Sequence, residues 1–375
     1  MLFSVFTHVP HFYHDSKYYA YSPYVKEMNL WLRNIDEVEV VAPIIKKSVP
    51  NHTLISYQHS QLKFTHIPSI NLLSLKGTFK SLINLPFLFF KIYQAMSRAD
   101  HIHIRCPGNI GLIACFVQIL FSKKKKTAKY AGNWDPAFKQ PWSYRLQRSI
   151  LNNTFLTRNM SVLVYGDWQD NSQNIIPFFT ASYSEEKREK ITKEFQKPYK
   201  FIFTGSLVEG KRPLFAIKLM EILIARHLPV KLDIYGNGEL FESLKSYIRE
   251  KKLEPFVTLH GNHREDVLIE AYKNSHFALL PSKSEGWPKA IAEAMFFGCI
   301  PIATNVSCLK NMLNNGQRGV LLKNSGKEIN VKDASEKIIK LLEEPSSLKV
   351  MSLEAQKWSQ QYTLEKFECA VKQLL

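Results

Sequence analysis

Two glutamates stand eight residues apart in the segment PSKSEGWPKAIAEAMFFGCIPIA. Glu285 lies in the loop that follows an apolar run, and Glu293 lies in the second turn of a helix that is predicted to begin at Pro288. The first turn of a helix has free backbone N–H groups, here at Lys289 and Ala290, and these suit a diphosphate. Carboxylates repel phosphates, but they accept hydrogen bonds from sugar hydroxyls. Together the two features indicate a site for a nucleotide-sugar.

Three further segments place glycines or polar side chains directly after predicted strands. In FIFTGSLVEGK the strand ends at Gly205, and the ammonium of Lys211 can reach a diphosphate and stabilise the charge that develops as this group departs. In YGNGE, Gly236 permits a tight turn and the close approach of a ligand. In LHGNHR, Asn262 and His263 are either contacts to the nucleotide or ordinary loop residues. The three segments are therefore candidates for the same ligand.

The Glu-x7-Glu segment SEGWPKAIAEAMFFGCIPIA resembles the retaining glycosyltransferases of the GT-B fold, family 4. The resemblance is strong over Phe201–Leu322 and mainly topological before it. It implies that Glu285 contacts the donor sugar, that Glu293 holds the ribose hydroxyls, and that a nucleotide-diphosphate sugar binds as a substrate rather than a cofactor. The donor-binding residues that it implies are Gly205, Lys211, Arg212, Gly236, Asn262, His263, Glu285, Gly286, Trp287, Pro288, Lys289, Ala290 and Glu293.

The sequence departs from the family pattern at two places. The family usually has an arginine after the first glycine, but this chain has Ser206, and Arg212 is the candidate to replace it. A histidine often follows a strand of the first domain, but this chain has AGNWD there, so Asn133 or Asp135 takes a related role. The predicted catalytic residues are Glu285, Lys211 and Asn133. These departures leave open a non-catalytic subunit that only binds the donor.

The first half of the chain contains candidates for the acceptor. His101, His103 and Arg105 alternate along a predicted strand and share one face. The histidines are predicted to be buried, whereas Arg105 at the strand end suits an acceptor or a phosphate. A loop after the first strand contains His11 and a tyrosine-rich stretch with Tyr21, and aromatic rings stack well on sugars. The predicted acceptor-binding residues are Arg105, His11, Tyr21 and Asp135.

These residues must be positioned by a sheet, because short apolar runs alternate with helical patterns along the chain. The pattern restarts once, which predicts an α/β protein with two Rossmann-like, doubly wound domains facing across a cleft, and ligands at the carboxyl ends of the strands. The predicted strands are Leu2–Thr7, Val38–Ala42, Leu62–Ile67, His101–Cys106, Thr127–Ala131, Ser161–Tyr165, Ile175–Phe178, Lys200–Thr204, Val230–Tyr235, Val257–His260, Phe277–Leu280, Ile300–Ala303 and Val320–Leu322.

The boundary between the domains is predicted near Phe195–Tyr199, in a charged stretch that contains a proline. An acceptor-binding domain then covers residues 1–196, and a nucleotide-sugar-binding domain covers residues 197–355. A C-terminal helix at about 356–375 is expected to cross back to the first domain. The 375-residue length suits two domains of this size.

The net charge of +17 favours an anionic partner. Residues 1–196 hold 24 Lys and Arg against 13 Asp and Glu, a net charge of +11, so the first domain is the better candidate for it. The lysine run Lys123–Lys126 either docks on an anionic membrane surface or complements the C-terminus of a helix. The basic residues come without a nucleic-acid recognition motif, so nucleic-acid binding is not expected.

Five scattered cysteines indicate reduced thiols in the cytoplasm. The N-terminus lacks the basic region of a signal peptide, and the apolar stretches Leu82–Met96 and Ile110–Phe121 are shorter than the roughly 20 residues of a membrane span. They are predicted to be helices that pack on a sheet. We expect a cytoplasmic protein, with peripheral binding to the inner face of the membrane as a further hypothesis.

The predicted activity is the transfer of a hexose from a nucleotide-diphosphate sugar to a glycan or lipid-linked acceptor, in cell-envelope polysaccharide synthesis. The sequence has no DxD triplet, so we expect no metal site, and no cofactor beyond the sugar donor itself. The resemblance implies attack from the front face with retention. A sugar-nucleotide epimerase on the same scaffold is an alternative that fits the paired glutamates less well.

Overall fold

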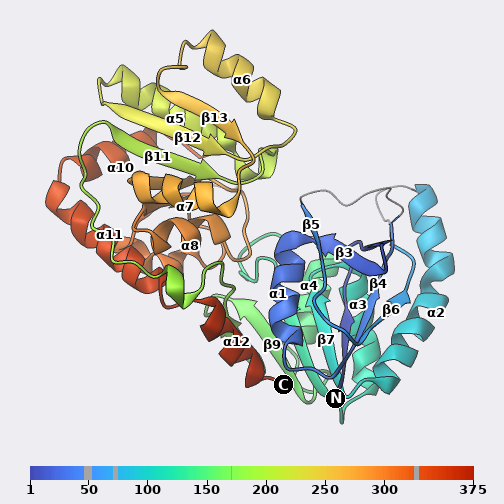
Figure 1. Ribbon diagram of the computed structural model, residues 1–375. Helices are drawn as coiled ribbons and strands as arrows, with labels where there is room; N and C mark the ends of the chain where they lie inside the picture. The colour runs from blue at the N-terminus through green and yellow to red at the C-terminus, as the bar shows by residue number, and fades with distance from the viewer. Residues whose placement is uncertain (46–52, 71–74, 170, 325–328) are drawn as a thin grey trace. The chain divides into compact units, whose positions relative to one another are not determined.

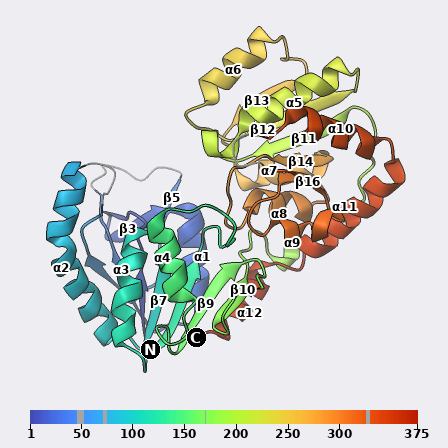
Figure 2. The same cartoon turned by 180° about the vertical axis from the view of Figure 1, so that it is seen from behind.

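The computed structural model describes residues 1–45, 53–70, 75–169, 171–324 and 329–375. The chain divides into two compact units, of which the first comprises Met1–Phe179 with Phe367–Leu375 and the second comprises Thr180–Lys366. Each unit is built around a parallel sheet that is covered by helices (Figures 1 and 2). The prediction of two doubly wound α/β domains is therefore confirmed.

The first unit contains a seven-stranded sheet in the order β10-β9-β8-β7-β1-β4-β6. Neighbouring strands are parallel throughout. Figure 1 shows α1 in front of this sheet, and Figure 2 shows α3 and α4 on its other face. The elements are β1 (Leu2–Phe6), α1 (Ser22–Leu32), β4 (Glu37–Ala42), β6 (Leu62–His66), α2 (Leu75–Arg98), β7 (His101–Cys106), α3 (Asn109–Val117), β8 (Lys125–Tyr130), α4 (Trp142–Leu151), β9 (Met160–Tyr165), β10 (Ile175–Phe178) and the larger part of α12 (Leu364–Lys372).

A small antiparallel sheet replaces the loop that was predicted around Tyr21. It consists of β2 (Phe12–His14), β3 (Lys17–Tyr21) and β5 (Leu54–Ser56). The hairpin between β2 and β3 turns at Asp15 and Ser16, both of which have positive φ angles (45° and 59°), as a two-residue hairpin turn requires. The turn therefore orders the tyrosine-rich stretch as a strand.

The second unit contains a six-stranded parallel sheet in the order β13-β12-β11-β14-β15-β16. Helix α5 packs against both α6 and α10, and α8 packs against β14, β15 and α11. The elements are β11 (Tyr199–Thr204), α5 (Pro213–Ala225), β12 (Val230–Tyr235), α6 (Phe241–Glu250), β13 (Val257–Gly261), α7 (Glu265–Asn274), β14 (Phe277–Leu280), α8 (Lys289–Phe296), β15 (Ile300–Thr304), α9 (Leu309–Met312), β16 (Val320–Leu322), α10 (Val331–Leu342) and α11 (Pro345–Ser359).

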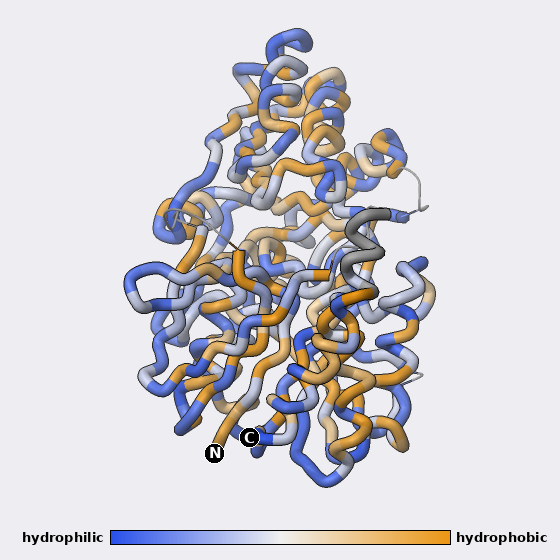
Figure 3. The backbone as a smooth tube through the Cα atoms, turned by 90° about the vertical axis from the view of Figure 1, so that its right-hand side faces the viewer, coloured by the Kyte–Doolittle hydropathy of each residue, from blue (hydrophilic) through white to orange (hydrophobic). Residues whose placement is uncertain are grey.

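The central strands are buried along their whole length. Every residue of β7, β14 and β15 is buried, as expected for parallel strands with helices on both faces. Figure 3 shows apolar stretches inside the units and hydrophilic stretches at many of the turns. All thirteen predicted strands are present, and their ends differ from the prediction by two residues at most. No helix in the described part of the chain is long and apolar enough to cross a membrane.

The units divide earlier than the sequence predicted, between Phe179 and Thr180 rather than near residue 196. The segment after Phe179 is held to the second unit, because the ammonium of Lys193 donates to the carbonyls of Tyr272 (2.6 Å) and Lys273 (2.5 Å). The predicted C-terminal helix is two helices, α11 and α12. Residues from Phe367 onward belong to the first unit.

Candidate functional site

The loops that follow β11, β12 and β13 lie against one another at the carboxyl edge of the second sheet. The N–H of Gly205 donates to the carbonyl of Tyr235 (3.0 Å), and the N–H of Gly236 donates to the carbonyl of Gly261 (2.8 Å). These bonds continue the sheet pairing one step into the loops. The glycine-containing segments of the sequence are therefore neighbours in the fold.

Glycine is required at two positions of the loop after β12. A Cβ atom on Gly236 would overlap the carbonyl oxygen of Gly205, and one on Gly238 would overlap the carbonyl oxygen of Leu207. Gly205 itself has a positive φ of 149°, and no other atom lies within 4 Å of the place where its Cβ would be. The backbone at Gly205 thus faces open space that a ligand can approach.

Lys211 and Glu285 form an ion pair where β11 and β14 lie side by side, with 2.5 Å between Nζ and Oε1. The Lys211 side chain is 32% exposed and the Glu285 side chain is 8% exposed. The N–H of Lys283 donates to the carbonyl of Gly210 (2.8 Å), which ties the two loops together. The structure therefore brings two of the predicted catalytic residues into direct contact.

Arg212 follows this pair and starts α5 from a left-handed backbone conformation (φ 53°, ψ 49°). Its Nη1 atom lies 3.4 Å from the carbonyl oxygen of Pro281. Arg212 therefore sits at the same loops as the ion pair, whereas Ser206 is exposed on the loop after Gly205. An arginine conformation with positive φ is uncommon and marks a constrained position.

Glu293 lies in the second turn of α8, as predicted, and both of its carboxylate oxygens accept hydrogen bonds. Ser182 Oγ donates to Oε1 (2.6 Å), and the hydroxyl of Tyr272 donates to Oε2 (3.3 Å). Tyr272 also shares a hydrogen bond with the hydroxyl of Thr204 at the end of β11 (2.8 Å). Burial raises the pKa of Glu293, while the bond from Ser182 opposes that rise.

The start of α8 differs from the prediction at one amide. The N–H of Lys289 donates to the carbonyl of Trp287 (2.9 Å), so it is not one of the free groups at this helix end. Pro288, which precedes the helix, accepts from the N–H groups of Ile291 and Ala292 (3.0 and 3.1 Å). The Lys289 N–H is therefore already bonded within a tight turn before the helix. Of the two predicted N–H donors, Ala290 remains the candidate to bind a diphosphate.

Trp287 anchors the loop that carries Glu285. Its ring packs on Trp358 (6.1 Å between centroids) and Tyr362 (5.5 Å), and the guanidinium of Arg318 lies 5.5 Å from the Trp358 ring. The hydroxyl of Ser307 donates to the carbonyl of Gly286 (2.9 Å). These contacts fix the backbone next to Glu285.

The predicted base-binding residues Asn262 and His263 are both exposed after β13. The ring of His263 meets Tyr235 edge-on (5.6 Å), and Tyr235 stacks flat on His260 (4.4 Å, 6° between planes). His260 Nε2 lies 2.6 Å from an oxygen of Asp233. Tyr235 and His260 were not among the predicted residues, although both stand at strand ends.

In the first unit, Arg105 belongs to a buried charge network. Its Nη1 lies 2.5 Å from Oε1 of Glu27, and Lys129 Nζ lies 2.9 Å from the other oxygen. The Arg105 side chain is only 10% exposed and lies over the ring of Tyr24 (5.4 Å). This differs from the expected role, because the guanidinium is already paired with a carboxylate.

His11 also differs from the expectation, since it is fully buried. Its Nδ1 bonds the carbonyl of Val9 and its Nε2 bonds the hydroxyl of Tyr57, both at 2.8 Å. Burial lowers its pKa to about 4. His8, two residues after the end of β1, has an exposed side chain that lies against Gly108. Desolvation, followed by the positive charge of Arg105, lowers its pKa.

The remaining predicted residues lie on the loop after β8 and on the hairpin. Asn133 is 7% exposed; its Oδ1 accepts from the N–H of Asp135 (2.9 Å), and its amide nitrogen has no hydrogen-bond partner among the described residues. Asp135 in turn accepts from the N–H of Ala137 (2.8 Å). Tyr21 is 56% exposed at the end of β3. Tyr21 is therefore exposed, Asp135 is half-buried, and the Asn133 side chain is largely enclosed.

This chain is similar to known glycosyltransferases. Residues 184–358 match the family model of glycosyl transferases group 1, which is a little under half of the chain. The UDP-Gal:alpha-D-GlcNAc-diphosphoundecaprenol alpha-1,3-galactosyltransferase of Escherichia coli is 26% identical over 74% of this chain and 75% of its own length. The poly(glycerol-phosphate) alpha-glucosyltransferase of Bacillus subtilis is 24% identical, but the alignment spans only 26% of that protein.

Solved structures show the same fold over the whole chain. Sucrose-phosphate synthase from Thermosynechococcus elongatus has a TM-score of 0.67 at 15% identity and covers 100% of this chain and 98% of its own. Anabaena HepE in complex with UDP has a TM-score of 0.67 at 12% identity, with 99% and 98% covered. The chain therefore has the GT-B fold, with the family match in its second unit.

Proposed function

We propose that the protein is a retaining, metal-independent hexosyltransferase of family 4, which moves a sugar from a nucleotide-diphosphate donor to a glycan or lipid-linked acceptor. The observation that carries this proposal is the set of Lys211, Glu285 and Glu293 at the carboxyl edge of one sheet, beside the open backbone of Gly205. The family match over residues 184–358 supports it.

In this proposal the donor diphosphate lies beside Gly205 and replaces the Glu285 carboxylate as the ionic partner of Lys211. The freed carboxylate of Glu285 then accepts hydrogen bonds from the sugar hydroxyls, while Glu293 accepts them from the ribose. The ammonium of Lys211 stabilises the negative charge that develops on the leaving diphosphate. The bond between the anomeric carbon and the diphosphate oxygen breaks, the acceptor oxygen bonds to that carbon from the same face, and the acceptor proton passes to the departing diphosphate.

The acceptor is assigned to the first unit, where Tyr21 and His8 are exposed and Asp135 is half-buried. The E. coli relative acts, by its name, on a diphosphoundecaprenol-linked sugar, and the Bacillus relative acts on poly(glycerol-phosphate). These names support a role in the synthesis of cell-envelope polysaccharide. They also make UDP the first nucleotide to test, since UDP is named for the E. coli relative and is bound in the HepE structure.

Binding to an anionic membrane surface is part of the same proposal, with the protein on its cytoplasmic face. Helix α2 buries one apolar side (Leu88 and Ile92) and exposes another, on which Ile83, Phe87 and Phe90 are 64%, 50% and 55% exposed. An exposed apolar stripe of this kind suits the interface of a bilayer.

The lysine run next to this helix contributes in two ways. Lys124 Nζ donates to the carbonyls of Ser97 and Ala99 at the end of α2, and Lys126 Nζ donates to the carbonyls of Gln118 and Phe121, so these two complement helix ends. Lys123 and Lys125 are exposed; Lys125 Nζ donates to the main-chain oxygen of Leu375 (2.8 Å), and Lys123 supplies charge for anionic lipid.

The direct test is thermal unfolding of the protein and of Glu293→Gln against UDP, GDP, ADP, TDP and CMP. One nucleotide at 100 times its dissociation constant should stabilise the protein by about 2.7 kcal/mol, and the variant should lose this effect. Stabilisation by none of them would overturn the proposal. Binding without sugar transfer to any acceptor would instead favour a donor-binding subunit.

A further inference from the structure

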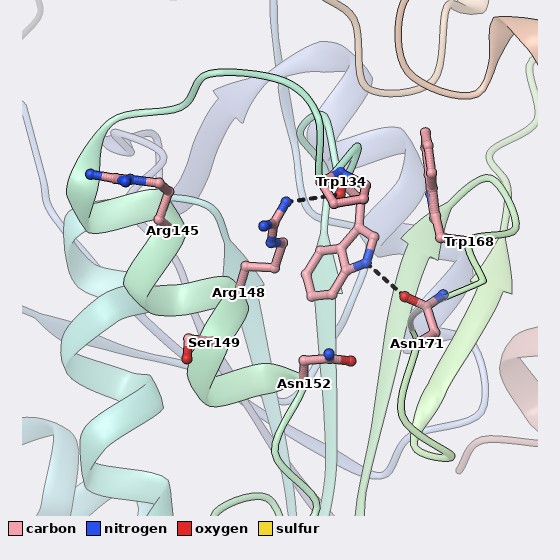
Figure 4. A pocket seen from close by; sticks show the side chains of 8 residues that line it. Trp134, Arg145, Arg148, Ser149, Asn152, Trp168 and Asn171 are labelled. Carbon is pink, nitrogen blue, oxygen red and sulfur yellow. Dashed lines mark hydrogen bonds between the residues drawn. The ribbon is translucent and has the colours of Figure 1, made fainter.

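A groove of about 330 Å³ runs beside α4 in the first unit (Figure 4). It lies between the outer side of this helix and the segments that follow β8 and β9. Its lining residues are Trp134, Pro136, Arg145, Arg148, Ser149, Asn152, Trp168 and Asn171. The volume is at the lower end of the about 300–1,000 Å³ typical of small-molecule sites, so the groove accommodates one sugar unit rather than a long oligosaccharide.

Two arginines supply positive charge on one side of the groove. Arg145 and Arg148 stand three residues apart on α4 and therefore share a face of the helix. No carboxylate among the described residues lies within 4 Å of either guanidinium. This contrasts with Arg105, whose charge Glu27 already compensates.

The inner arginine is held in place by the backbone. Arg148 Nη1 donates to the carbonyls of Trp134 (3.4 Å) and Asp135 (3.2 Å), both of which follow β8. This fixes the Arg148 guanidinium at the inner wall, while Arg145 is exposed at the outer end and its guanidinium points away from Trp134 and Trp168 (Figure 4). Guanidinium groups bind phosphates and carboxylates through paired hydrogen bonds, so this side of the groove suits an anion.

Indole rings form the opposite side. Trp168 is half-buried, and its Nε1 donates to the carbonyl of Tyr165 at the end of β9 (2.9 Å), which fixes the ring. Trp134 is buried and lies between Arg148 and Trp168, with its Nε1 donating to Oδ1 of Asn171 (3.0 Å) (Figure 4). A fixed, partly exposed indole is a surface on which the apolar face of a sugar ring stacks.

We propose that this groove binds a sugar unit carrying an anionic group, either a phosphate or a carboxylate. The sugar ring stacks on Trp168, the anionic group pairs with Arg148, and Arg145 supplies a second positive charge at the outer end of the groove. Because Asp135 directly follows the groove residue Trp134, the bound unit is part of the acceptor, an assignment that rests on the proposed glycosyltransferase function. The acceptor class is therefore an anionic glycan or a phosphate-linked sugar.

The test measures binding to the intact protein by isothermal titration calorimetry with glucose 1-phosphate, glucuronic acid, glucose and inorganic phosphate. At least one anionic sugar should bind about tenfold more tightly than glucose and than inorganic phosphate. Glucose 1-phosphate would identify a phosphate-linked unit, and glucuronic acid would identify a carboxylate-bearing unit. Arg145→Gln should weaken this binding about tenfold, and Arg249→Gln, which removes the same charge from an exposed position on α6, should not.

Equal binding of glucose and the anionic sugars, binding of phosphate alone as tightly as of the sugars, or insensitivity to Arg145→Gln would each overturn the proposal. The same samples are tested for stabilisation by UDP. Stabilisation by UDP without binding of an anionic sugar overturns the groove and leaves the donor site standing. Binding of an anionic sugar without any nucleotide effect removes the acceptor assignment and the proposed function with it.

Discussion

The ammonium of Lys211 lies 2.5 Å from a carboxylate oxygen of Glu285, across the gap between two loops that are 74 residues apart in sequence. When a donor binds, its diphosphate would replace the Glu285 carboxylate as the partner of the Lys211 ammonium, and the carboxylate would be released. The pair therefore keeps the 8% exposed carboxylate compensated in the free protein.

Replacement of Lys211 by methionine should reduce kcat/KM by about 10²–10³, because the leaving diphosphate loses a positioned cation. It should also lower the unfolding midpoint, because Glu285 is left enclosed without its partner. Steady-state kinetics of sugar transfer measure the first effect, with a nucleotide-sugar donor of the nucleotide that stabilises the protein. Thermal unfolding measures the second. Lys211→Arg keeps the charge and should retain more activity, so equal loss in both variants would contradict a role of the charge.

Gly236→Ala should destabilise the second unit by about 1–3 kcal/mol and weaken nucleotide binding, because its Cβ would overlap the Gly205 carbonyl and its φ is 140°. Urea unfolding and nucleotide titration measure the two effects. Gly210→Ala is the matched control, since no atom lies within 4 Å of the added Cβ. Similar losses of stability and nucleotide binding in both variants would show that the close approach of Gly236 to the Gly205 carbonyl does not determine either property.

Stability should fall as pH decreases from 6.5 to 4, because burial lowers the pKa of both His11 and His101 to about 4. In this window the unfolded chain binds protons that the folded chain does not, so the free energy of unfolding decreases with acidification. Each histidine accounts for up to about 3 kcal/mol at the acid end. Urea unfolding at pH 7 and 4.5 measures the slope, and His11→Gln should flatten it; an unchanged slope would contradict the assignment.

Vesicle flotation tests the exposed face of α2. Phe87→Ser combined with Phe90→Ser should reduce binding to vesicles that contain phosphatidylserine, while leaving the unfolding midpoint nearly unchanged, because both side chains are at least half exposed. Lys123→Glu should weaken the binding in a salt-dependent way. Val350→Ser, at a 62% exposed position on α11, serves as control. Absence of binding by the unmodified protein at low salt would reject the membrane surface.

Most of the strands were predictable because they are short, largely apolar runs of buried residues, and the carboxyl-edge location of Glu285 and Glu293 followed from that pattern. The small sheet was missed, since β2 and β3 contain tyrosines and depend on the turn at Asp15 and Ser16. Local periodicity carries no signal for such an edge sheet, because its strands are short and only partly buried.

The partners of the site residues were not predictable. Ser182 is 111 residues from Glu293, and Glu27 is 78 residues from Arg105, so neither contact leaves a mark in local spacing. His11 is enclosed by Tyr57, which lies 46 residues further along the chain. A sequence pattern places a side chain at a strand end, but only the tertiary fold decides whether it faces a ligand or the core.

The last helix has a consequence for the order in which the protein is made. Phe367 packs on Phe178 and Phe179 in the first unit, with ring centroids 5.5 and 5.8 Å apart, and Lys129 lies 4.9 Å from the same ring. During synthesis the residues of the second unit leave the ribosome before Phe367 does. The first unit therefore begins to fold first and is completed last, and until then these two phenylalanines stay uncovered, a state in which exposed apolar surface favours aggregation.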